Sequence, residues 1–337
     1  MLDPTFNIPC SVDSIHHFHN DFNYIAGAFS LLFNSIVIYL SVKQTSKMRT
    51  YAKIIGLDSF FNICFTLTRC IVGQRPISTL DYYYYFTVTP LFFYSSKSLQ
   101  EFGVVLTYFV VYFHGGIPAV QFFYRYRALK DESVTMFQIS IAYCILLLFS
   151  MSNAVWYFWD FDSNPAQYYD AIYGGADGCN STKLPTVTVV YKNTVGFEIH
   201  NIYGQGGLCI IFLLLLYFAV QSFRIYNVNV RQMALKTRQM NKSVNILFIL
   251  QTVPPFIFML FPNLLFALNV LPADLMSYTS LALGVGPAIS PLFDALTVLL
   301  ILPSFRRQIL RKFWEPHLSV TKVEAITKDT TRSENFK

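Results

Sequence analysis

Residues 208–220 read LCIIFLLLLYFAV, an apolar run without a single charged side chain. The run shows no apolar and polar alternation, which argues against a strand of a membrane β-barrel. It is typical of the middle of a helix surrounded by lipid. The whole chain agrees, because hydrophobic residues make up 54% of its 337 residues and charged residues only 13%, against about 25% in soluble domains. A soluble fold of this composition would expose large apolar patches, so we predict an all-α membrane protein.

Seven stretches are long enough to cross a bilayer. A spanning helix needs about 20 apolar residues, since each residue rises about 1.5 Å and the hydrocarbon core is about 30 Å thick. Proline occurs inside the third and sixth stretches, where neighbouring helices can satisfy the freed carbonyls. We therefore predict a seven-transmembrane helix bundle, with six or eight spans as alternatives, at residues 22–42, 54–73, 99–123, 135–157, 204–222, 244–269 and 278–302.

Lysine and arginine predict the orientation. With the amino terminus outside, 20 of the 25 basic residues fall on the inner side, as the positive-inside rule requires. Residues 1–21 are then extracellular and residues 22–302 form the transmembrane domain. The first 20 residues lack the apolar run of a cleavable signal peptide. The net charge of +6 reflects this topology, and without a basic stripe interleaved with aromatic residues we expect no nucleic-acid partner.

The segment after the seventh span predicts two further regions. Residues 303–315 carry apolar side chains on one side and basic residues beside them, the pattern of an amphipathic helix in the inner membrane interface. The apolar set is Phe305, Ile309, Leu310, Phe313 and Trp314. Residues 316–337 are polar, and we expect a disordered cytoplasmic tail.

Outer segments contain a possible disulfide and a glycosylation sequon. Cys10, Cys179 and the less exposed Cys70 face the oxidising side, where disulfides persist. Cys10–Cys179 is the preferred pair and Cys70–Cys179 the alternative. The sequon at Asn180 lies in the outer loop 158–203 and can accept a glycan, whereas the sequon at Asn241 falls on the inner side and should stay unmodified.

Two aromatic or β-branched segments lie near the outer surface. Residues 186–191 read TVTVVY, which predicts either a short strand over the mouth of the bundle or a mobile tether. Residues 82–86 read YYYYF, and their aromatic rings fit a belt at the membrane interface.

Four motifs occur in order along the spans. Residues 43–51 read KQTSKMRTY, residues 122–129 read FFYRYRAL, residues 251–255 read QTVPP, and residues 286–292 read GPAISPL. Together they resemble the Str superfamily of nematode seven-helix serpentine chemoreceptors, its Srd and Str branches above all, from about Asn34 to Phe313. Two features depart from related patterns. Ser290 stands where the family usually has an acid, and residues 89–106 lack the cysteine of rhodopsin-type receptors.

The resemblance implies a G-protein-coupled chemosensory receptor in the plasma membrane of a sensory neuron, in its cilium. Its partners would be an odorant or other small chemical and a heterotrimeric G protein, with no cofactor. Arg125, Tyr126 and Arg127 would contact the G protein. Their charge alone is equally consistent with positive-inside topology.

Polar residues within the spans are the remaining candidates. Glu101, Tyr108 and Tyr112 share one helix face, so they either line an outer ligand pocket or pack between helices. Asp58 and Asp294 lie in the inner halves of their spans, and with Ser290 they form a candidate polar switch that would hold a cation or water. A structural hydrogen-bonding role is the alternative.

Other classes of protein fit less well. A seven-span ligand-gated channel of the insect odorant-receptor kind should have its amino terminus inside, against the distribution of Lys and Arg. A secondary transporter should show internal repeats, and none is visible. The six histidines are scattered and no acid cluster lies within a span, so we predict neither an enzyme nor a metal site.

Overall fold

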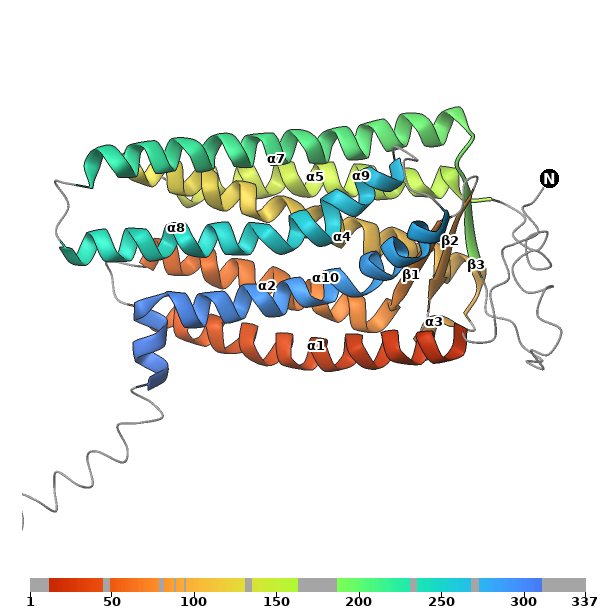
Figure 1. The fold of residues 1–337 in the computed structure, drawn as a ribbon, viewed down its shortest axis with the longest axis horizontal. Helices are drawn as coiled ribbons and strands as arrows, with labels where there is room; N and C mark the ends of the chain where they lie inside the picture. The colour runs from red at the N-terminus through yellow and green to blue at the C-terminus, as the bar shows by residue number, and fades with distance from the viewer. Residues whose placement is uncertain are drawn as a thin grey trace, which may run out of the picture.

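Residues 12–44, 49–78, 82–87, 89–93, 95–130, 135–162, 187–230, 235–267 and 273–310 are described by a computed structural model of the chain. Its long helices run side by side, with a small sheet across one end of the bundle (Figure 1). We call this end of the bundle the sheet end. We call the opposite end the Arg125 end, after the residue at the inner end of the third predicted span.

Each predicted span overlaps a helical segment over most of its length, and the predicted bundle fold is confirmed. Six helices of the described chain are long and apolar enough to cross a membrane. The remaining predicted span, 244–269, corresponds over its described part to three successive helical pieces, α8, η3 and α9. The bounds are α1 (Val12–Val42), α2 (Arg49–Val72), the short α3 (Pro90–Phe93), α4 (Lys97–Leu129), α5 (Met136–Asp160), α7 (Val195–Asn229), α8 (Leu235–Pro255), η3 (Phe256–Leu260), α9 (Phe261–Ala267) and α10 (Ala273–Ile301).

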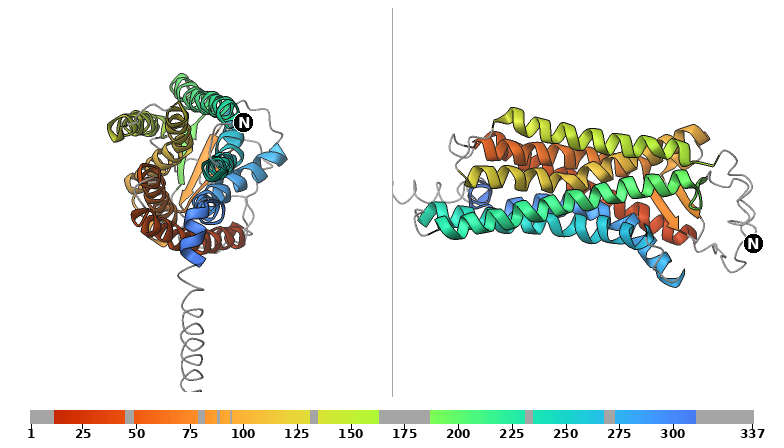
Figure 2. Two further views of the ribbon diagram at one scale, coloured as in Figure 1. Left: turned by 90° about the vertical axis from the view of Figure 1, so that its left-hand side faces the viewer. Right: turned by 90° about the horizontal axis from the view of Figure 1, so that it is seen from above.

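Helix α4 occupies the centre of the bundle. It packs against α2, α5, α7 and α8, and the view along the bundle shows the long helices grouped closely together (Figure 2). Its 33 residues correspond to a length of about 50 Å. Helix α10 packs against α1, α2 and α8, so α4 and α10 together contact most of the bundle.

Outward faces of the bundle are apolar. Ile202 on α7 is 73% exposed and Leu213 is 65% exposed, while Leu208 on the same helix is buried. A helix that exposes apolar side chains over its length is suited to lipid rather than to water.

Local sequence explains where two helices begin and break. Thr135 starts α5 with a capping box, in which its side chain and that of Gln138 each accept a backbone N–H of the other residue. Pro254 and Pro255 end α8, and the wider turns of η3 follow them. Proline lacks the N–H that would continue the α-helical ladder, and π-helical turns accommodate such interruptions.

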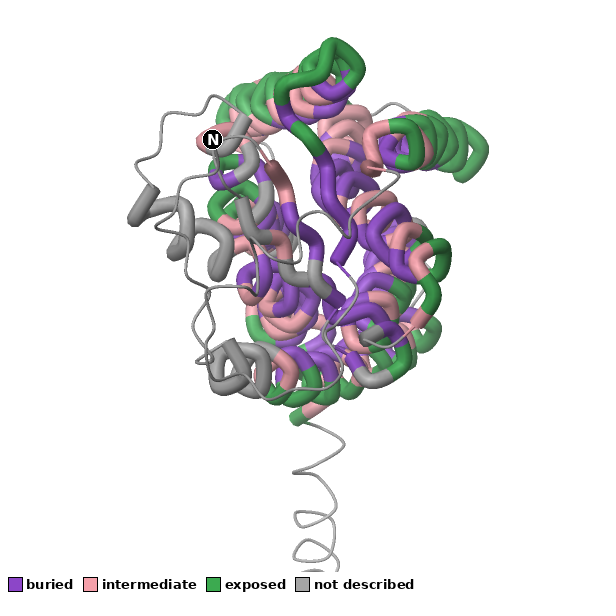
Figure 3. The backbone as a smooth tube through the Cα atoms, turned by 90° about the vertical axis from the view of Figure 1, so that its right-hand side faces the viewer, coloured by how far each residue is buried: buried purple, intermediate pink, exposed green. Residues whose placement is uncertain are grey.

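Three antiparallel strands form the sheet in the order β1 (Gln74–Ser78), β2 (Tyr82–Thr87) and β3 (Val187–Tyr191). Tyr85 pairs with Thr188 and Gln74 pairs with Thr87. Seen from this end, buried stretches of strand lie inside the ring of helices (Figure 3). The strand interpretation of residues 187–191 is therefore confirmed.

The interfacial belt predicted for residues 82–86 is wrong for the two residues at its centre. Tyr84 is 3% exposed and Tyr85 is fully buried, because β2 is the middle strand and lies over the helix ends. Consecutive aromatic residues fit a central strand as well as a belt, and sequence alone did not separate the two.

Residues 303–310 form a helix after Leu302 that turns away from α10 (Figure 1). Phe305 is fully buried and joins the same apolar cluster as Leu302 and Phe248, with Ile309 packed against it. Part of the apolar side predicted to face lipid is thus turned into the bundle. Residues 311–315 of the predicted helix, and the predicted tail, lie outside the described residues.

Candidate functional site

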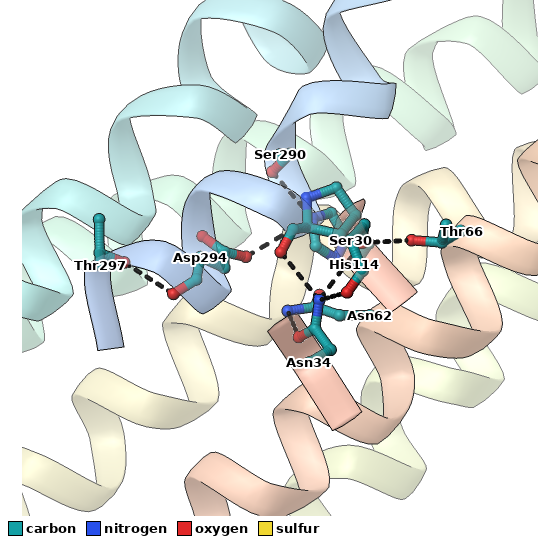
Figure 4. A network of polar contacts seen from close by, with 9 residues as sticks. Ser30, Asn34, Asn62, Thr66, His114, Ser290, Asp294 and Thr297 are labelled. Atoms are coloured by element: carbon teal, nitrogen blue, oxygen red, sulfur yellow. Dashed lines mark hydrogen bonds and ion pairs between the residues drawn. The ribbon is translucent and has the colours of Figure 1, made fainter. Parts of the chain in front are cut away.

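A chain of buried polar side chains joins α1 to α2 and α10 in the middle of the bundle (Figure 4). The hydroxyl oxygens of Ser30 and Thr66 lie 2.8 Å apart. The Asn34 amide donates to the carbonyls of Ser30 at 2.9 Å and of Pro291 at 3.0 Å. Asn62 donates to the side-chain oxygen of Asn34 at 3.3 Å. A polar network of this kind fixes how the three helices are rotated against one another.

His114 on α4 extends this polar region. Its Nε2 lies 3.0 Å from Ser290 Oγ and 4.0 Å from Asp294 Oδ2, and its ring stacks on Phe65 with 4.6 Å between centroids. Nδ1 of His114 and Oδ1 of Asp294 are buried and make no hydrogen bond within the described residues. The residues of this cluster come from four different helices, so a movement of any one helix changes its hydrogen bonding.

Asp58 and Asp294, predicted to form a polar switch, line one internal pocket. His114, Gln121 and Gln251 line it as well. The space is closed tightly around these side chains and leaves no room for a water molecule. In this conformation the pair of carboxyls is surrounded by protein groups.

A second pocket, of about 50 Å³, lies at the sheet end between α2, β1, α4 and α10. We call it the sheet-end pocket. Its lining residues are Arg69, Gln74, Pro76, Thr107, Tyr108, Val111, Leu283 and Pro287. Gly73, between α2 and β1, has φ 57°, the left-handed conformation that lets a helix end and the chain reverse. The Gly73 N–H donates to the carbonyl of Arg69 at 2.9 Å, and this turn brings Gln74 beside Arg69.

Tyr108 connects the pocket to a group of tyrosines under the sheet. Its hydroxyl lies 2.8 Å from that of Tyr85, and its ring stacks on Tyr157 with 4.0 Å between centroids. Burial raises the pKa of the Tyr85 phenol well above its ordinary value, so Tyr85 stays neutral.

The structure brings together two of the three predicted ligand residues, because the rings of Tyr108 and Tyr112 lie 6.2 Å apart between centroids, but it does not bring Glu101 to them. Tyr108 lines the sheet-end pocket, whereas Glu101 forms an ion pair with Lys97 at 3.6 Å one turn earlier on α4. Tyr112 accepts a hydrogen bond from Gln205 at 3.4 Å and packs beside Leu208, so it faces α7.

Arg125 joins α4 to α8 near the end of the bundle opposite the sheet. Its Nη2 donates to Asn241 Oδ1 at 3.0 Å and its Nε to Asn245 Oδ1 at 3.4 Å. Arg125 is only 8% exposed, and both acceptors are neutral amides. Tyr126 packs on Phe218 of α7. The next residue, Arg127, is partly buried. The predicted triplet therefore lies where α4, α7 and α8 approach one another.

A groove between α7 and α8 opens beside Arg125. It is lined by aromatic and aliphatic residues such as Tyr226 and Ile246 and by two basic residues, Arg238 and Lys242. Asn245, which binds Arg125, also lines it. Breaking the hydrogen bonds between Arg125 and α8 would therefore change the shape of this groove.

Several predicted sites lie outside the described residues, namely Cys10, Cys179 and Asn180. Cys70 is a free thiol in the structure, and Cys179, its partner in the alternative disulfide, is not among the described residues. Its Sγ lies 3.6 Å from the carbonyl oxygen of Asn23.

Sequence reasoning did not assign Arg69 to a site. The available signal was a charged residue close to the end of an otherwise apolar span, which is a functional candidate by default. The asparagines at 34 and 62 were also missed, because polar residues in a span carry no indication of which helix they face.

Comparisons with known proteins agree with this architecture. No curated protein sequence matches the chain significantly. The crystal structure of squid rhodopsin is similar with a TM-score of 0.59 and 13% sequence identity, over 91% of this chain and 87% of that chain, which shows a shared fold. The family described as serpentine type 7TM GPCR chemoreceptor Str matches residues 19–310. The chain is a multi-pass membrane protein and belongs to this Str family of serpentine chemoreceptors.

Proposed function

We propose that this chain is a chemosensory receptor that binds a small molecule in the sheet-end pocket and activates a heterotrimeric G protein at the Arg125 end. The observation that carries the proposal is the contact of Arg125 with Asn241 and Asn245, which closes α4 against α8 at the opposite end from the pocket.

One helix connects the two sites. Tyr108 and Arg125 both lie on α4, 17 positions apart, which is about 25 Å along the helix axis. Between them, His114 and Gln121 contribute to the central polar region. A ligand that shifts α4 or α10 at the sheet end would change these contacts. The same shift would favour a bundle in which α8 has moved away from Arg125.

The closed contact is suited to a reversible switch. Each bond from a buried charged donor to a neutral amide contributes about 1.5–3 kcal/mol, and differential binding of a ligand can offset a contribution of that size. When α8 moves, Arg125 becomes available to the G protein together with Tyr126 and Arg127. The basic groove between α7 and α8 would accept the remaining contacts.

The proposed location is the plasma membrane of a sensory cilium, with the amino terminus and the sheet outside. The distribution of Lys and Arg supports this orientation. The Arg125 end then faces the cytoplasm, where heterotrimeric G proteins are found.

The test is the variant Arg125→Ala in cells that express the receptor with a G-protein dissociation sensor. We expect the ligand-evoked response to disappear while surface expression, measured by antibody against an amino-terminal tag, stays within about twofold of the native chain. Lys130→Ala, which removes a cation that lies over the Tyr126 ring without touching the amides of α8, is the matched control and should keep most of the response.

Two results would contradict the proposal. Full signalling by Arg125→Ala would remove the coupling role from this residue. A ligand-evoked current that persists in cells without G proteins would instead indicate a ligand-gated channel.

A further inference from the structure

Arg69 is a buried cation that has no acidic partner among the described residues. It is 4% exposed, at the sheet end of α2. Nη1 donates to the carbonyl of Gln74 at 3.4 Å and Nη2 donates to the carbonyl of Gly284. Nε is buried and makes no hydrogen bond within the described part of the chain. Both acceptors are neutral, so the positive charge of Arg69 is not balanced by these contacts.

An unbalanced charge in this position is costly. Transfer of an ionised group from water into protein is unfavourable unless a counter-charge and hydrogen bonds compensate it. An ionisable side chain inside a membrane-spanning helix therefore indicates a functional partner. The two carbonyl contacts orient the guanidinium, and its Nε–H makes no hydrogen bond within the described residues.

The sheet-end pocket lies directly against this guanidinium. Arg69 and Gln74 form its polar side, and the side-chain oxygen of Gln74 is also buried without a hydrogen bond. Val111, Leu283 and Pro287 form an apolar side. One polar side next to one apolar side is the arrangement of a site for a small amphipathic molecule.

Charge and size together define the class of ligand. A guanidinium presents its N–H groups in a planar fork that matches a carboxylate. A volume of about 50 Å³ corresponds to only a few water molecules, so the ligand has few heavy atoms. We propose that the sheet-end pocket binds a small organic carboxylate, whose charged group pairs with Arg69 and whose short hydrocarbon part contacts Val111, Leu283 and Pro287. This inference rests on the proposed receptor function and names its ligand class.

The experiment measures binding directly. Purified full-length receptor in lipid nanodiscs is titrated with sodium acetate, butanoate and hexanoate, and with the methyl ester of each, at constant ionic strength. The readout is the rise in thermal unfolding temperature as a function of concentration. We expect at least one carboxylate to bind about tenfold more tightly than its methyl ester, since the ester cannot pair with a cation.

Two variants identify the residue responsible. Arg69→Gln should abolish the preference for the acid over the ester. Gln74→Glu is nearly isosteric and places a carboxylate beside Arg69 within the protein, so it should also abolish acid binding. The matched control is Lys97→Gln, which removes a cation at the same end that pairs with Glu101 and does not line the pocket. It should keep the preference.

Equal binding of acids and esters would overturn the inference, as would an acid preference that survives Arg69→Gln. Stabilisation by sodium chloride equal to that by butanoate would also overturn it, because the site would then hold any small anion. G-protein signalling read in parallel separates the two proposals. Acid binding without signalling contradicts the receptor mechanism, and signalling evoked only by neutral compounds contradicts the ligand class.

Discussion

Ser290 shows how a single hydroxyl takes part in the central polar region. It is fully buried and its Oγ lies 3.0 Å from His114 Nε2. The related family usually has an acid at this position, and Asp294 one turn later lies within 4.0 Å of the same nitrogen. His114 thus lies between a neutral and an acidic partner on one helix, and the loss of the neutral partner should be costly.

Replacing Ser290 by Ala should destabilise the receptor by about 1–3 kcal/mol, because it leaves a buried imidazole nitrogen without its nearest partner. Thermal unfolding of the purified variant would measure the change. Ser152→Ala is the control, since this exposed hydroxyl bonds to Tyr203 on the outside of the bundle. Equal losses for the two variants would show that the contact with His114 contributes nothing specific.

Residue-level prediction from sequence succeeded where a residue type is unusual for its surroundings. Acids inside apolar spans are rare, so Asp58 and Asp294 could be selected as candidates, and the structure places both on one pocket. Spacing along a helix was a weaker guide. Glu101 shares a face with Tyr108 by count, yet Lys97 one turn away binds its carboxylate. Such a local ion pair competes with a ligand for the same side chain.

At the scale of elements, the turn after α2 determines the shape of the sheet-end pocket. Gly73 is the one described glycine with positive φ, and it directs the chain from α2 into β1. A side chain in this left-handed conformation is strained by about 1 kcal/mol.

Gly73→Ala should therefore lower the free energy of unfolding by about 1 kcal/mol and weaken ligand binding, because Arg69 and Gln74 flank the turn. Gly206→Ala is the control. A Cβ on Gly206 meets no atom within 4 Å, and alanine is favoured over glycine inside a helix by about 1 kcal/mol, so this variant should be neutral or stabilising. A stable Gly73→Ala receptor with unchanged binding would contradict the role of the turn.

Helices were predictable from sequence and the first two strands were not. Long apolar runs leave few alternatives to a spanning helix, and the structure mainly lengthened the helices, as α7 shows by beginning at Val195 rather than near residue 204. Strand β1 is short and pairs only with β2, and β2 in turn pairs with β3, which lies about 100 residues later. Pairing between such distant segments cannot be detected from local sequence pattern.

At the scale of the whole molecule, orientation in the membrane decides which end receives the ligand. The predicted topology places Asn180 outside and Asn241 inside. Asn241 is also 6% exposed and bonded to Arg125, so a glycan there would be incompatible with the folded bundle.

A glycosidase-sensitive shift on a denaturing gel tests the orientation. We expect the shift in the native chain to disappear in Asn180→Gln and to persist in Asn241→Gln. The reverse pattern would invert the topology and place the Arg125 end outside, where no G protein could reach it.

Coupling between the two ends of the bundle requires that the hydrogen bonds of Arg125 to α8 stabilise the inactive conformation. Asn241 does not line the sheet-end pocket. It accepts the shorter of the two hydrogen bonds from Arg125, at 3.0 Å. Removing this acceptor should destabilise the closed arrangement of α4 and α8 while leaving ligand contacts unchanged. A lost hydrogen bond from a charged donor, of about 1.5 kcal/mol, changes a two-state equilibrium about tenfold.

Asn241→Ala should therefore raise G-protein signalling in the absence of ligand by about tenfold, whereas Asn241→Asp should lower it, because a carboxylate forms a stronger, charge-assisted bond with Arg125. Both variants are compared at equal surface expression, with a dissociation sensor for the G protein. Opposite changes in the two variants would come from the strength of one contact, since general damage to the fold would lower signalling in both. If Asn241→Ala left basal signalling unchanged, the contact with Arg125 would not restrain α8, and activation would have to proceed through another part of the bundle.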